Sequence, residues 1–414
     1  MIRIIKADGT AEREQIASMR SRAAEVGADI ERAVGAVMQD VREKGFSAVE
    51  KYSLQFDRKA PYEIGMETLE EAYARCTGGL ISAMEHAAAN IRDYNEALLA
   101  TSREWISPDG GIVGRVVRGL TRVGLYVPGG TAAYPSSVLM NAIPAKVAGV
   151  KELIMVTPPT ENLNDAVLAA AKIAGVDRVI AVGGAQAVAA LAYGAGFIPK
   201  VDKLVGPGNA YVAAAKRMAY GTLDIDMVAG PSEVLVIADE SADPKYVAAD
   251  LLSQAEHDRL ASSVLLTTSQ GLATRVDAEI IRQTSYLGRS EIIAASLRDF
   301  GCAIVCRDLK QAAELANEVA PEHLEIVTED PRSLLPDIQN AGAVFLGAWS
   351  PEPLGDYLAG PDHVLPTSGT ARFFSPLSVD SFLKTMSVVE FSRETLAPIR
   401  EEIVTMAEAE HLTA

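Results

Sequence analysis

VGLYVPGG at residues 123–130 is a short apolar run that ends in Pro-Gly-Gly, and three similar runs follow it. They are ELIMVTPP at 152–159, RVIAVGG at 178–184 and KLVGPG at 203–208, separated by Ala-rich segments. Apolar runs that end in Gly or Pro and lead into helical segments at this spacing are typical of βα units in a parallel sheet. The pattern therefore predicts a doubly wound domain.

The chain on either side of these runs predicts further structured parts. A second set of apolar runs, at 233–239, 262–268, 302–306, 323–327 and 343–347, indicates a second α/β domain. The first hundred residues are rich in helix formers and predict a helical segment that forms a cap or an interface. The segment from about residue 376 ends in EEIVTMAEAEHLTA, which predicts an acidic helix that contacts another subunit.

Composition limits the classes of function. A chain of 414 residues exceeds the size of one hydrophobic core, so two or more domains are expected. The net charge of −17 repels a phosphate backbone and argues against nucleic acid as a partner. The two long charge-free stretches, 123–145 and 179–199, are interrupted by Pro or Gly and predict buried elements rather than membrane spans. Without a signal-peptide pattern at its start, the chain is expected in the cytoplasm.

Three cysteines cannot form a disulfide framework in a chain of this length, so reduced thiols are expected. Cys302 and Cys306 are four apart on one expected strand and share a face, which favours a role as small core residues.

The glycine-rich turns give weak support for a dinucleotide. GPGNAY at 206–211 has Tyr211 where the fingerprint needs its third glycine, and VGGAQAVAALAYG at 182–194 has the wrong spacing. By motif alone, these glycines are better interpreted as tight βα turns.

The five histidines are more informative. His86 is predicted to be a surface residue. In LLSQAEHD, Gln254 and His257 are three apart and project from one face of a helix. With a later carboxylate they would suit zinc with an open coordination position, although a surface helix is the simpler interpretation of that pair alone.

Two further segments are candidates for catalysis. Glu322 and His323, in PEHLEIV, are expected at the mouth of a strand, where an imidazole can take an alcohol proton and a carboxylate can activate water. A solvated turn is an equal alternative. Asp356 and His363 are expected in a Gly/Pro-rich loop at 355–378, and long ordered loops of this kind are usually functional. A packed Ω-loop would explain either residue singly.

Taken together, VGLYVPGG, GPGNAYV, AGPSEVLVIAD, LLSQAEHD, PEHLEI, GDYLAGPDHVLPTSGTARF and AEAEHLTA resemble the histidinol dehydrogenase family over essentially the whole chain. The resemblance implies a zinc enzyme of histidine biosynthesis that oxidises L-histidinol through L-histidinaldehyde to L-histidine while reducing two NAD. It also implies an intertwined homodimer.

The resemblance assigns roles to particular residues. It implies Gln254, His257 and Asp356 as metal ligands and Glu322 and His323 as the catalytic acid–base pair. Its implied contacts to NAD are Tyr126, Gln186 and Asn209. Its implied substrate contacts are Ser232, Gln254, His257, His323, Asp356, His363 and Glu410.

The expected fold is two doubly wound Rossmann-like domains with a helical N-terminal segment and a helical C-terminal tail. We expect an N-terminal arm at 1–20 and a larger α/β domain with the metal and catalytic residues, made of 21–121 and 235–375. An incomplete Rossmann-like NAD domain is expected at 122–234, and a tail that contacts the other subunit at 376–414.

The chain departs from the family pattern at two places. The family continues past Leu-Thr-Ala into a histidine that is the remaining zinc ligand, whereas this sequence stops at Ala414. Truncation is the favoured explanation, and substitution by His411 is the alternative. Asp362 stands where the family usually has Asn, which we expect to add charge beside His363 and raise its pKa.

Three other functions remain open at this point. The first is a related zinc and NAD alcohol dehydrogenase that acts on another small amino or sulfonated alcohol. The second is a metal-dependent hydrolase that uses Glu322 and a zinc-bound water without a nucleotide. The third is a binding protein that has lost its activity.

Overall fold

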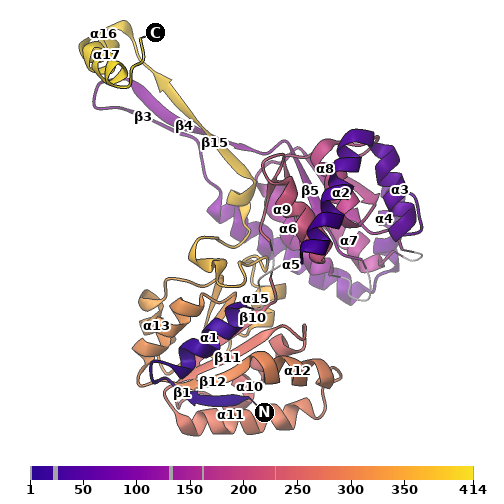
Figure 1. Cartoon of the computed structure of the whole chain (residues 1–414), viewed down its shortest axis with the longest axis vertical. Coiled ribbons are helices and arrows are strands. Elements are labelled where there is room, and N and C mark those ends of the chain that lie inside the picture. The colour runs from indigo at the N-terminus through magenta and orange to yellow at the C-terminus, as the bar shows by residue number, and fades with distance from the viewer. Residues whose placement is uncertain (1, 22–26, 130–133, 161–162, 229, 414) are drawn as a thin grey trace.

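The computed structural model describes residues 2–21, 27–129, 134–160, 163–228 and 230–413. It has two lobes, each built on a six-stranded sheet, and a long arm that extends from them (Figure 1). The first lobe carries the sheet of residues 62–225, and the second carries the sheet of residues 3–6 and 233–346.

The sheet of the first lobe has the strand order β2-β7-β6-β5-β8-β9 and contains the four runs that open the sequence analysis. All neighbours are parallel except β2 and β7. The chain moves outward from β5 through β6 to β7 and then returns to place β8 on the other side of β5, which is the order of a doubly wound sheet. The strands are β2 (Tyr62–Ile64), β5 (Arg122–Tyr126), β6 (Glu152–Thr157), β7 (Arg178–Ala181), β8 (Lys203–Val205) and β9 (Asp224–Ile225).

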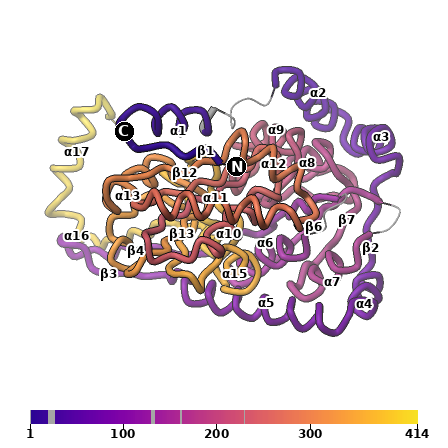
Figure 2. The backbone as a smooth tube through the Cα atoms, turned by 90° about the horizontal axis from the view of Figure 1, so that it is seen from below, coloured from indigo at the N-terminus to yellow at the C-terminus, as the bar shows by residue number. Residues whose placement is uncertain are grey.

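Helices cover both faces of this sheet. One face packs against α4 (Met66–Arg75), α5 (Gly78–Leu98), α6 (Pro135–Val147) and α7 (Asp165–Ala174). The other packs against α2 (Ala28–Lys44), α3 (Phe46–Phe56), α8 (Gly184–Tyr193) and α9 (Ala210–Ala219). Figure 2 shows α2 and α3 on one side of the lobe and α4 and α5 on the other.

This packing differs from the expected domain division, which grouped residues 21–121 with 235–375. The helices α2 to α5 bury their apolar faces against the sheet of residues 122–225 instead. Val34 and Leu69, for example, are fully buried in the two cores of the first lobe. Amphipathic helices show from sequence which face they bury, but not which sheet they bury it against.

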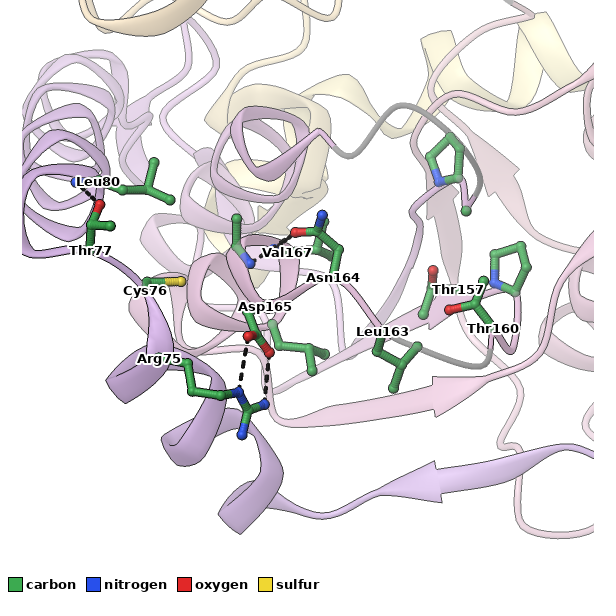
Figure 3. A pocket seen from close by; sticks show the side chains of 15 residues that line it. Arg75, Cys76, Thr77, Leu80, Thr157, Thr160, Leu163, Asn164, Asp165 and Val167 are labelled. Carbon is green, nitrogen blue, oxygen red and sulfur yellow. Dashed lines mark hydrogen bonds and ion pairs between the residues drawn. The ribbon is translucent and has the colours of Figure 1, made fainter.

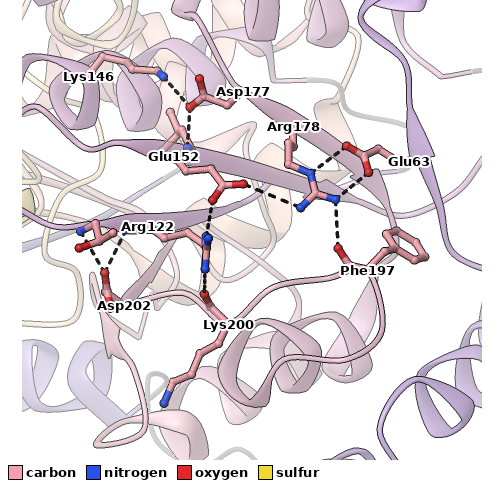
Figure 4. A network of polar contacts seen from close by, with 11 residues as sticks. Glu63, Arg122, Lys146, Glu152, Asp177, Arg178, Phe197, Lys200 and Asp202 are labelled. Carbon is pink, nitrogen blue, oxygen red and sulfur yellow. Dashed lines mark hydrogen bonds and ion pairs between the residues drawn. The ribbon is translucent and has the colours of Figure 1, made fainter.

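Charged side chains join the starts of the first lobe's strands, at the edge opposite the Gly- and Pro-containing turns that follow the strands (Figure 4). Nε of Arg122, at the start of β5, donates a hydrogen bond to the carboxylate of Glu152, at the start of β6, at 2.5 Å. Arg178 at the start of β7 makes two hydrogen bonds to Glu63 on β2, at 2.8 and 2.7 Å. Bidentate pairs of this kind fix geometry, so the network helps set the order of neighbouring strands.

The second lobe has a wholly parallel sheet with the order β1-β12-β11-β10-β13-β14. Its core strands are the five predicted runs. They are β10 (Glu233–Ala238), β11 (Ser262–Thr267), β12 (Gly301–Val305), β13 (His323–Val327) and β14 (Ala343–Leu346), and β1 (Arg3–Lys6) adds an edge. Cys302 and Cys306 lie in one core cluster, as their spacing predicted.

Helices cover both faces of this sheet too. One face packs against α10 (Pro244–Ala255), α11 (Gln270–Thr284) and α12 (Ser290–Phe300). The other packs against α1 (Ala11–Ser21), α13 (Leu309–Val319) and α14 (Pro331–Leu334). The mixed α/β fold with parallel sheets that the sequence predicted is therefore confirmed.

The arm is an antiparallel sheet of β3 (Arg103–Ile106), β4 (Ile112–Gly119) and β15 (Leu383–Glu390), which leads to α16 (Arg393–Leu396) and α17 (Arg400–Ala409). Figure 1 shows α16 and α17 at its far end, away from both lobes. Apolar side chains are exposed along it, among them Ile106 at 74%, Val389 at 70% and Met406 at 66%. Among the described residues, no helix has the length and apolar character needed to cross a membrane.

Candidate active site

A pocket of about 380 Å³ lies between the two lobes. The first lobe contributes the turns after the carboxyl ends of β5 and β8, including Pro128 and Gly206. The second contributes residues at the amino ends of β10 and β13. This interlobe pocket brings together seven predicted residues that are far apart in sequence: Ser232, Gln254, His257, Glu322, His323, Asp356 and His363.

His323, the first residue of β13, is only 4% exposed. Its Nδ1 lies 3.1 Å from the backbone carbonyl oxygen of Glu233, the first residue of β10. Because a carbonyl oxygen can only accept, Nδ1 carries a proton and donates it. The other nitrogen, Nε2, faces Asp356 at 3.5 Å, beyond good hydrogen-bond geometry. This nitrogen therefore has no hydrogen-bond partner among the described residues.

Glu322 lies beside this imidazole, with Oε2 at 3.8 Å from Nδ1 of His323. The same oxygen accepts the backbone N–H of Glu233 at 2.9 Å. Burial raises the pKa of Glu322 to about 8, against the opposing effect of His323. Burial lowers the pKa of His323, but the charge of Glu322 and then the contact with Asp356 raise it to about 10. The two groups therefore titrate as a coupled pair with displaced pKa values, which is a feature of catalytic sites.

Asp356 is in α15 (Glu352–Tyr357), rather than in the open loop that the sequence indicated. Burial opposes its ionisation, but the contact with His323 and the nearby imidazoles outweigh burial and lower its pKa. Nδ1 of His363 donates to the carbonyl oxygen of Asp356 at 3.0 Å, and Nε2 lies 3.3 Å from Oγ of Ser137. Groups from both lobes therefore orient the imidazole of His363.

The predicted metal ligands differ in burial. Gln254 is fully buried at the end of α10, and neither its Oε1 nor its Nε2 has a hydrogen-bond partner among the described residues. Leaving a buried amide unpaired costs about 1 to 3 kcal/mol, so a partner from outside the chain is expected here. His257 follows the helix and is exposed at the rim of the pocket. Amide, imidazole and carboxylate donors around one cavity fit a zinc ion.

Sequence reasoning missed Glu352. Its carboxylate, with His323 and Asp356, offers ligand atoms that all lie within 4.8 Å of one another. Glu352 is 2% exposed and accepts a hydrogen bond from Oγ of Ser253 at 2.9 Å. The spacing Glu-x-x-x-Asp in PEPLGD places both carboxylates on one helical face, and that pattern was the available signal.

A buried ion pair in the pocket wall was also missed. Nζ of Lys216 contacts Asp226 and donates to the carbonyl oxygen of Gly206 at 2.8 Å. The carboxylate of Asp226 also accepts the backbone N–H of Gly206 at 2.8 Å. Together they fix the turn after β8, which lines the pocket. Lys216 stands in a helical stretch with no motif, so its role depends on the fold.

The prediction that Asp362 raises the pKa of His363 was wrong, because the pKa of His363 is lowered. Asp362 is 4% exposed, and only its Oδ1 has a partner, the backbone N–H of Val364 at 2.8 Å. Burial, followed by the charges of Asp226 and Asp356, raises its pKa well above the usual range. Burial lowers the pKa of His363.

The three residues predicted to contact NAD line a separate pocket of about 630 Å³. Tyr126 ends β5, Gln186 lies in the first turn of α8, and Asn209 caps α9. The Tyr126 hydroxyl accepts the backbone N–H of Gly184 at 3.0 Å. This Tyr126 pocket adjoins the interlobe pocket, because Tyr126 and Pro128 are two residues apart and Gly208 and Asn209 are consecutive.

A third cavity, of about 570 Å³, lies beside the start of α7 (Figure 3). Arg75 makes two hydrogen bonds to Asp165 at 2.9 and 2.7 Å, and Asn164 caps the helix through the N–H groups of Ala166 and Val167. It shares Pro128 with the interlobe pocket and Pro158 with the Tyr126 pocket. None of the predicted site residues lines it.

Glu410 and His411 are not brought to the pocket of their own chain. Both are exposed at the end of α17, which Figure 1 shows at the far end of the arm. His411 has a φ of 62° and accordingly lies just beyond the helix.

Two parallel α/β lobes, a buried imidazole–carboxylate pair between them and an adjoining cavity at Rossmann-like turns define a two-lobed enzyme of the oxidoreductase class. The family model for histidinol dehydrogenase matches residues 20–414. The chain belongs to the histidinol dehydrogenase family.

Relatives and a solved structure agree with this membership. The histidinol dehydrogenase of Clostridium acetobutylicum is 51% identical over 100% of this chain and 97% of its own length. That of Caldanaerobacter subterraneus subsp. tengcongensis is 54% identical over 93% and 91%. The crystal structure of histidinol dehydrogenase from Elizabethkingia anophelis is 35% identical, with a TM-score of 0.94 over 99% of this chain and 95% of that one.

A more distant structural match shows the fold alone. A lactaldehyde dehydrogenase structure has a TM-score of 0.50 at 13% identity, over 92% of this chain and 91% of that one. The membership establishes a histidinol dehydrogenase, an NAD-dependent oxidoreductase, so the hydrolase is wrong as a description. The comparisons give no support to a different alcohol as substrate.

Proposed function

We propose that the interlobe pocket is where L-histidinol is oxidised in two steps, through L-histidinaldehyde to L-histidine, at the expense of two NAD. The observation that carries this proposal is the hydrogen bond from Nδ1 of His323 to the carbonyl oxygen of Glu233. It commits the imidazole to one tautomer and leaves Nε2 to face the cavity as a base.

In the first step His323 takes the hydroxyl proton of the substrate while the carbinol carbon gives a hydride to NAD. The products are the aldehyde, NADH and a proton held on Nε2. Ser232 and His363 are proposed as substrate contacts, because both line the same cavity. Burial of the pair at His323 and Glu322 keeps water from competing for these positions.

In the second step Glu322 takes a proton from a water molecule as the oxygen adds to the aldehyde carbon, while the aldehyde oxygen takes the proton held on Nε2 of His323. The resulting hydrate loses its hydroxyl proton to His323 and its hydride to a second NAD, which gives the carboxylic acid. Glu322 is held for this role by the backbone N–H of Glu233. A fixed carboxylate beside a fixed imidazole divides the two proton transfers between two groups.

Zinc is proposed at Gln254, His257 and Asp356, with a further ligand from outside the chain. The unpaired amide of Gln254 is the observation that supports a bound partner. When bound, the ion would act as a Lewis acid toward the substrate's nitrogen atoms, and its charge would offset the carboxylates that raise the pKa of His323. Glu352 stands close enough to Asp356 to compete as a ligand.

The dinucleotide is proposed to lie across the Tyr126 pocket and the interlobe pocket. Its adenosine half would occupy the Tyr126 pocket with Gln186 and Asn209, and its nicotinamide would reach past Pro128. The adjoining walls of the two cavities support this placement. Ligands of doubly wound sheets bind at the carboxyl ends of the strands where the strand order reverses, and both cavities use such turns.

A homodimer is proposed in which the arm of one subunit supplies Glu410 to the partner's pocket. The exposed apolar side chains along the arm support a covered surface. Glu410 lies at the far end of the arm, away from the interlobe pocket of its own chain. It can therefore contribute to such a pocket only in a second copy of the protein.

The test is a full-turnover assay of the zinc-loaded protein with L-histidinol as the limiting substrate and excess NAD. Two NADH and one L-histidine per L-histidinol are expected. Absence of NADH at saturating L-histidinol would reject the proposed chemistry. One NADH with accumulated aldehyde would reject the second step alone.

A further inference from the structure

Asp57 has no part in the chemistry described above, yet it forms part of the wall of the Tyr126 pocket. It follows directly after α3 and is half-buried. Its Oδ2 accepts a hydrogen bond from Nε2 of Gln186 at 3.1 Å, across 129 positions of sequence. This contact joins the helical layer of α3 to the first turn of α8.

The amide of Gln186 is held in one orientation by this bond. Gln186 is 1% exposed, and its Oε1 has no hydrogen-bond partner within the described chain. An unpaired buried oxygen is costly, so it marks a place where a bound molecule supplies a donor. Asp57 therefore presents a carboxylate at the wall of the cavity, with the buried amide of Gln186 behind it.

The remaining lining of the cavity suits a flat aromatic ring. Phe56 and Tyr211 are 57% and 49% exposed, and Tyr52 stacks on Phe56 with 5.8 Å between ring centroids. Small apolar side chains of α2, including Ala33 and Val37, line the cavity as well. Aromatic and apolar surfaces accept a purine, while acceptor oxygens accept sugar hydroxyl groups.

The charge of the lining distinguishes between two dinucleotides. Of the fourteen described residues that line the pocket, none is Lys or Arg, and Asp57 is the one ionisable carboxyl group. A 2′-phosphate on the adenosine ribose would find no cation among these lining residues and would face a carboxylate. An unphosphorylated ribose would instead donate its 2′-hydroxyl proton.

We propose that Asp57 is the residue that selects NAD over NADP, by accepting a hydrogen bond from the 2′-hydroxyl group of the adenosine ribose and repelling a 2′-phosphate. This inference rests on the proposed placement of the adenosine half of NAD in the Tyr126 pocket. Asp57 contributes to specificity and takes no part in hydride transfer.

The experiment compares kcat/KM for NAD and NADP in the full-length wild type, in Asp57→Asn and in Asp29→Asn. Asn at position 57 can still accept from Gln186, so it removes the charge and keeps the structural bond. Asp29 is an exposed carboxylate on α2 and serves as the matched control. We expect Asp57→Asn to lower the NAD:NADP ratio of kcat/KM by about tenfold or more, through a higher KM for NAD and a lower KM for NADP. The control should keep the wild-type ratio.

A second measurement uses the wild type alone and does not depend on the folding of a variant. An NAD analogue that lacks the 2′-hydroxyl group of the adenosine ribose should have a KM raised by about tenfold with kcat unchanged. Equal KM values for NAD and this analogue would overturn the proposal, as would an unchanged NAD:NADP ratio in Asp57→Asn.

The failure of the underlying placement gives a different result. If Tyr126→Phe and Asn209→Ala leave the KM for NAD unchanged, the adenosine half does not bind in this pocket and both proposals fall. If these two substitutions raise the KM for NAD while Asp57→Asn leaves the NAD:NADP ratio of kcat/KM unchanged, the placement of the adenosine half stands. Only the assignment of Asp57 is then wrong.

Discussion

His323 and Glu233 begin two adjacent strands, and the imidazole Nδ1 of the first donates to the backbone carbonyl oxygen of the second at 3.1 Å. The backbone N–H of Glu233 in turn donates a hydrogen bond to the carboxylate of Glu322 at 2.9 Å. One peptide segment therefore orients both members of the proposed catalytic pair. A side chain held by backbone atoms of a central sheet keeps its position whether or not substrate is present.

Replacement of His323 tests the base. We expect His323→Asn to lower kcat for both oxidations by about a hundredfold to ten-thousandfold, because both steps need a proton acceptor at Nε2. The measurement is NADH formation with L-histidinol and, separately, with L-histidinaldehyde. His86→Asn, an exposed histidine on α5, is the control. Loss of only one of the two oxidations would contradict a shared base.

Replacement of Glu322 separates the two steps. Glu322→Gln keeps an oxygen that can accept from Glu233 but cannot take a proton from water. The yield is expected to fall from two NADH per L-histidinol toward one, with aldehyde accumulating. With L-histidinaldehyde as the substrate, kcat should fall by about a hundredfold or more. If both half-reactions slow by the same factor, Glu322 has a role other than the activation of water.

Replacement of Asp356 tests the metal site. Asp356→Asn removes the carboxylate that the proposed zinc needs, and we expect zinc affinity to fall by at least about a hundredfold. Zinc content after dialysis and the zinc-induced rise in unfolding midpoint report on binding independently of activity. Glu256→Gln, which neutralises the residue beside His257, is the control. A variant at Asp356 that retains zinc as the control does would place the metal elsewhere.

The shared-site dimer predicts complementation between two inactive variants. A subunit with Glu410→Gln cannot complete the pocket of its partner. A subunit with His323→Asn lacks the base in its own pocket. A mixed dimer then has one pocket with both groups intact. After subunit exchange in equal amounts, about a quarter of wild-type activity is expected, because half of the dimers are mixed and each has one working site. No recovery in dimers shown to be mixed would contradict the exchange of Glu410.

Asp362 predicts a pH dependence of stability. Its folded pKa is raised above the unfolded value of about 4, so the folded state holds the proton to higher pH than the unfolded state does. The contribution of Asp362 to the free energy of unfolding of the wild type is therefore lost as pH rises from about 4 through the folded pKa. Asp362→Asn should remove this loss, so its unfolding midpoint should exceed that of the wild type by an amount that grows over this range. An exposed control, Asp109→Asn, should show no such trend.

The central strands of both sheets were predictable because each is a short apolar run, and the four runs of the first lobe also end in Gly or Pro. The strands β1, β2 and β9 were not predicted. Runs such as Glu152–Thr157 and Ser262–Thr267 are buried along nearly their whole length, and central strands of parallel sheets require that composition. The family resemblance named the catalytic, metal and substrate-contact residues by motif. Seven of those side chains line one cavity, as a common site requires.

What the sequence by itself determined is the set of elements and the side chains with suitable chemistry, because periodicity and motif are local properties of the chain. Only the tertiary structure decided which sheet helices α2 to α5 cover, because an amphipathic face fits either one. It also decided the position of Glu352 beside Asp356, the burial that raises the pKa of Asp362, and the contact between Asp57 and Gln186. These are relations between distant segments. Burial and electrostatic environment depend on such neighbours, and no local pattern encodes them.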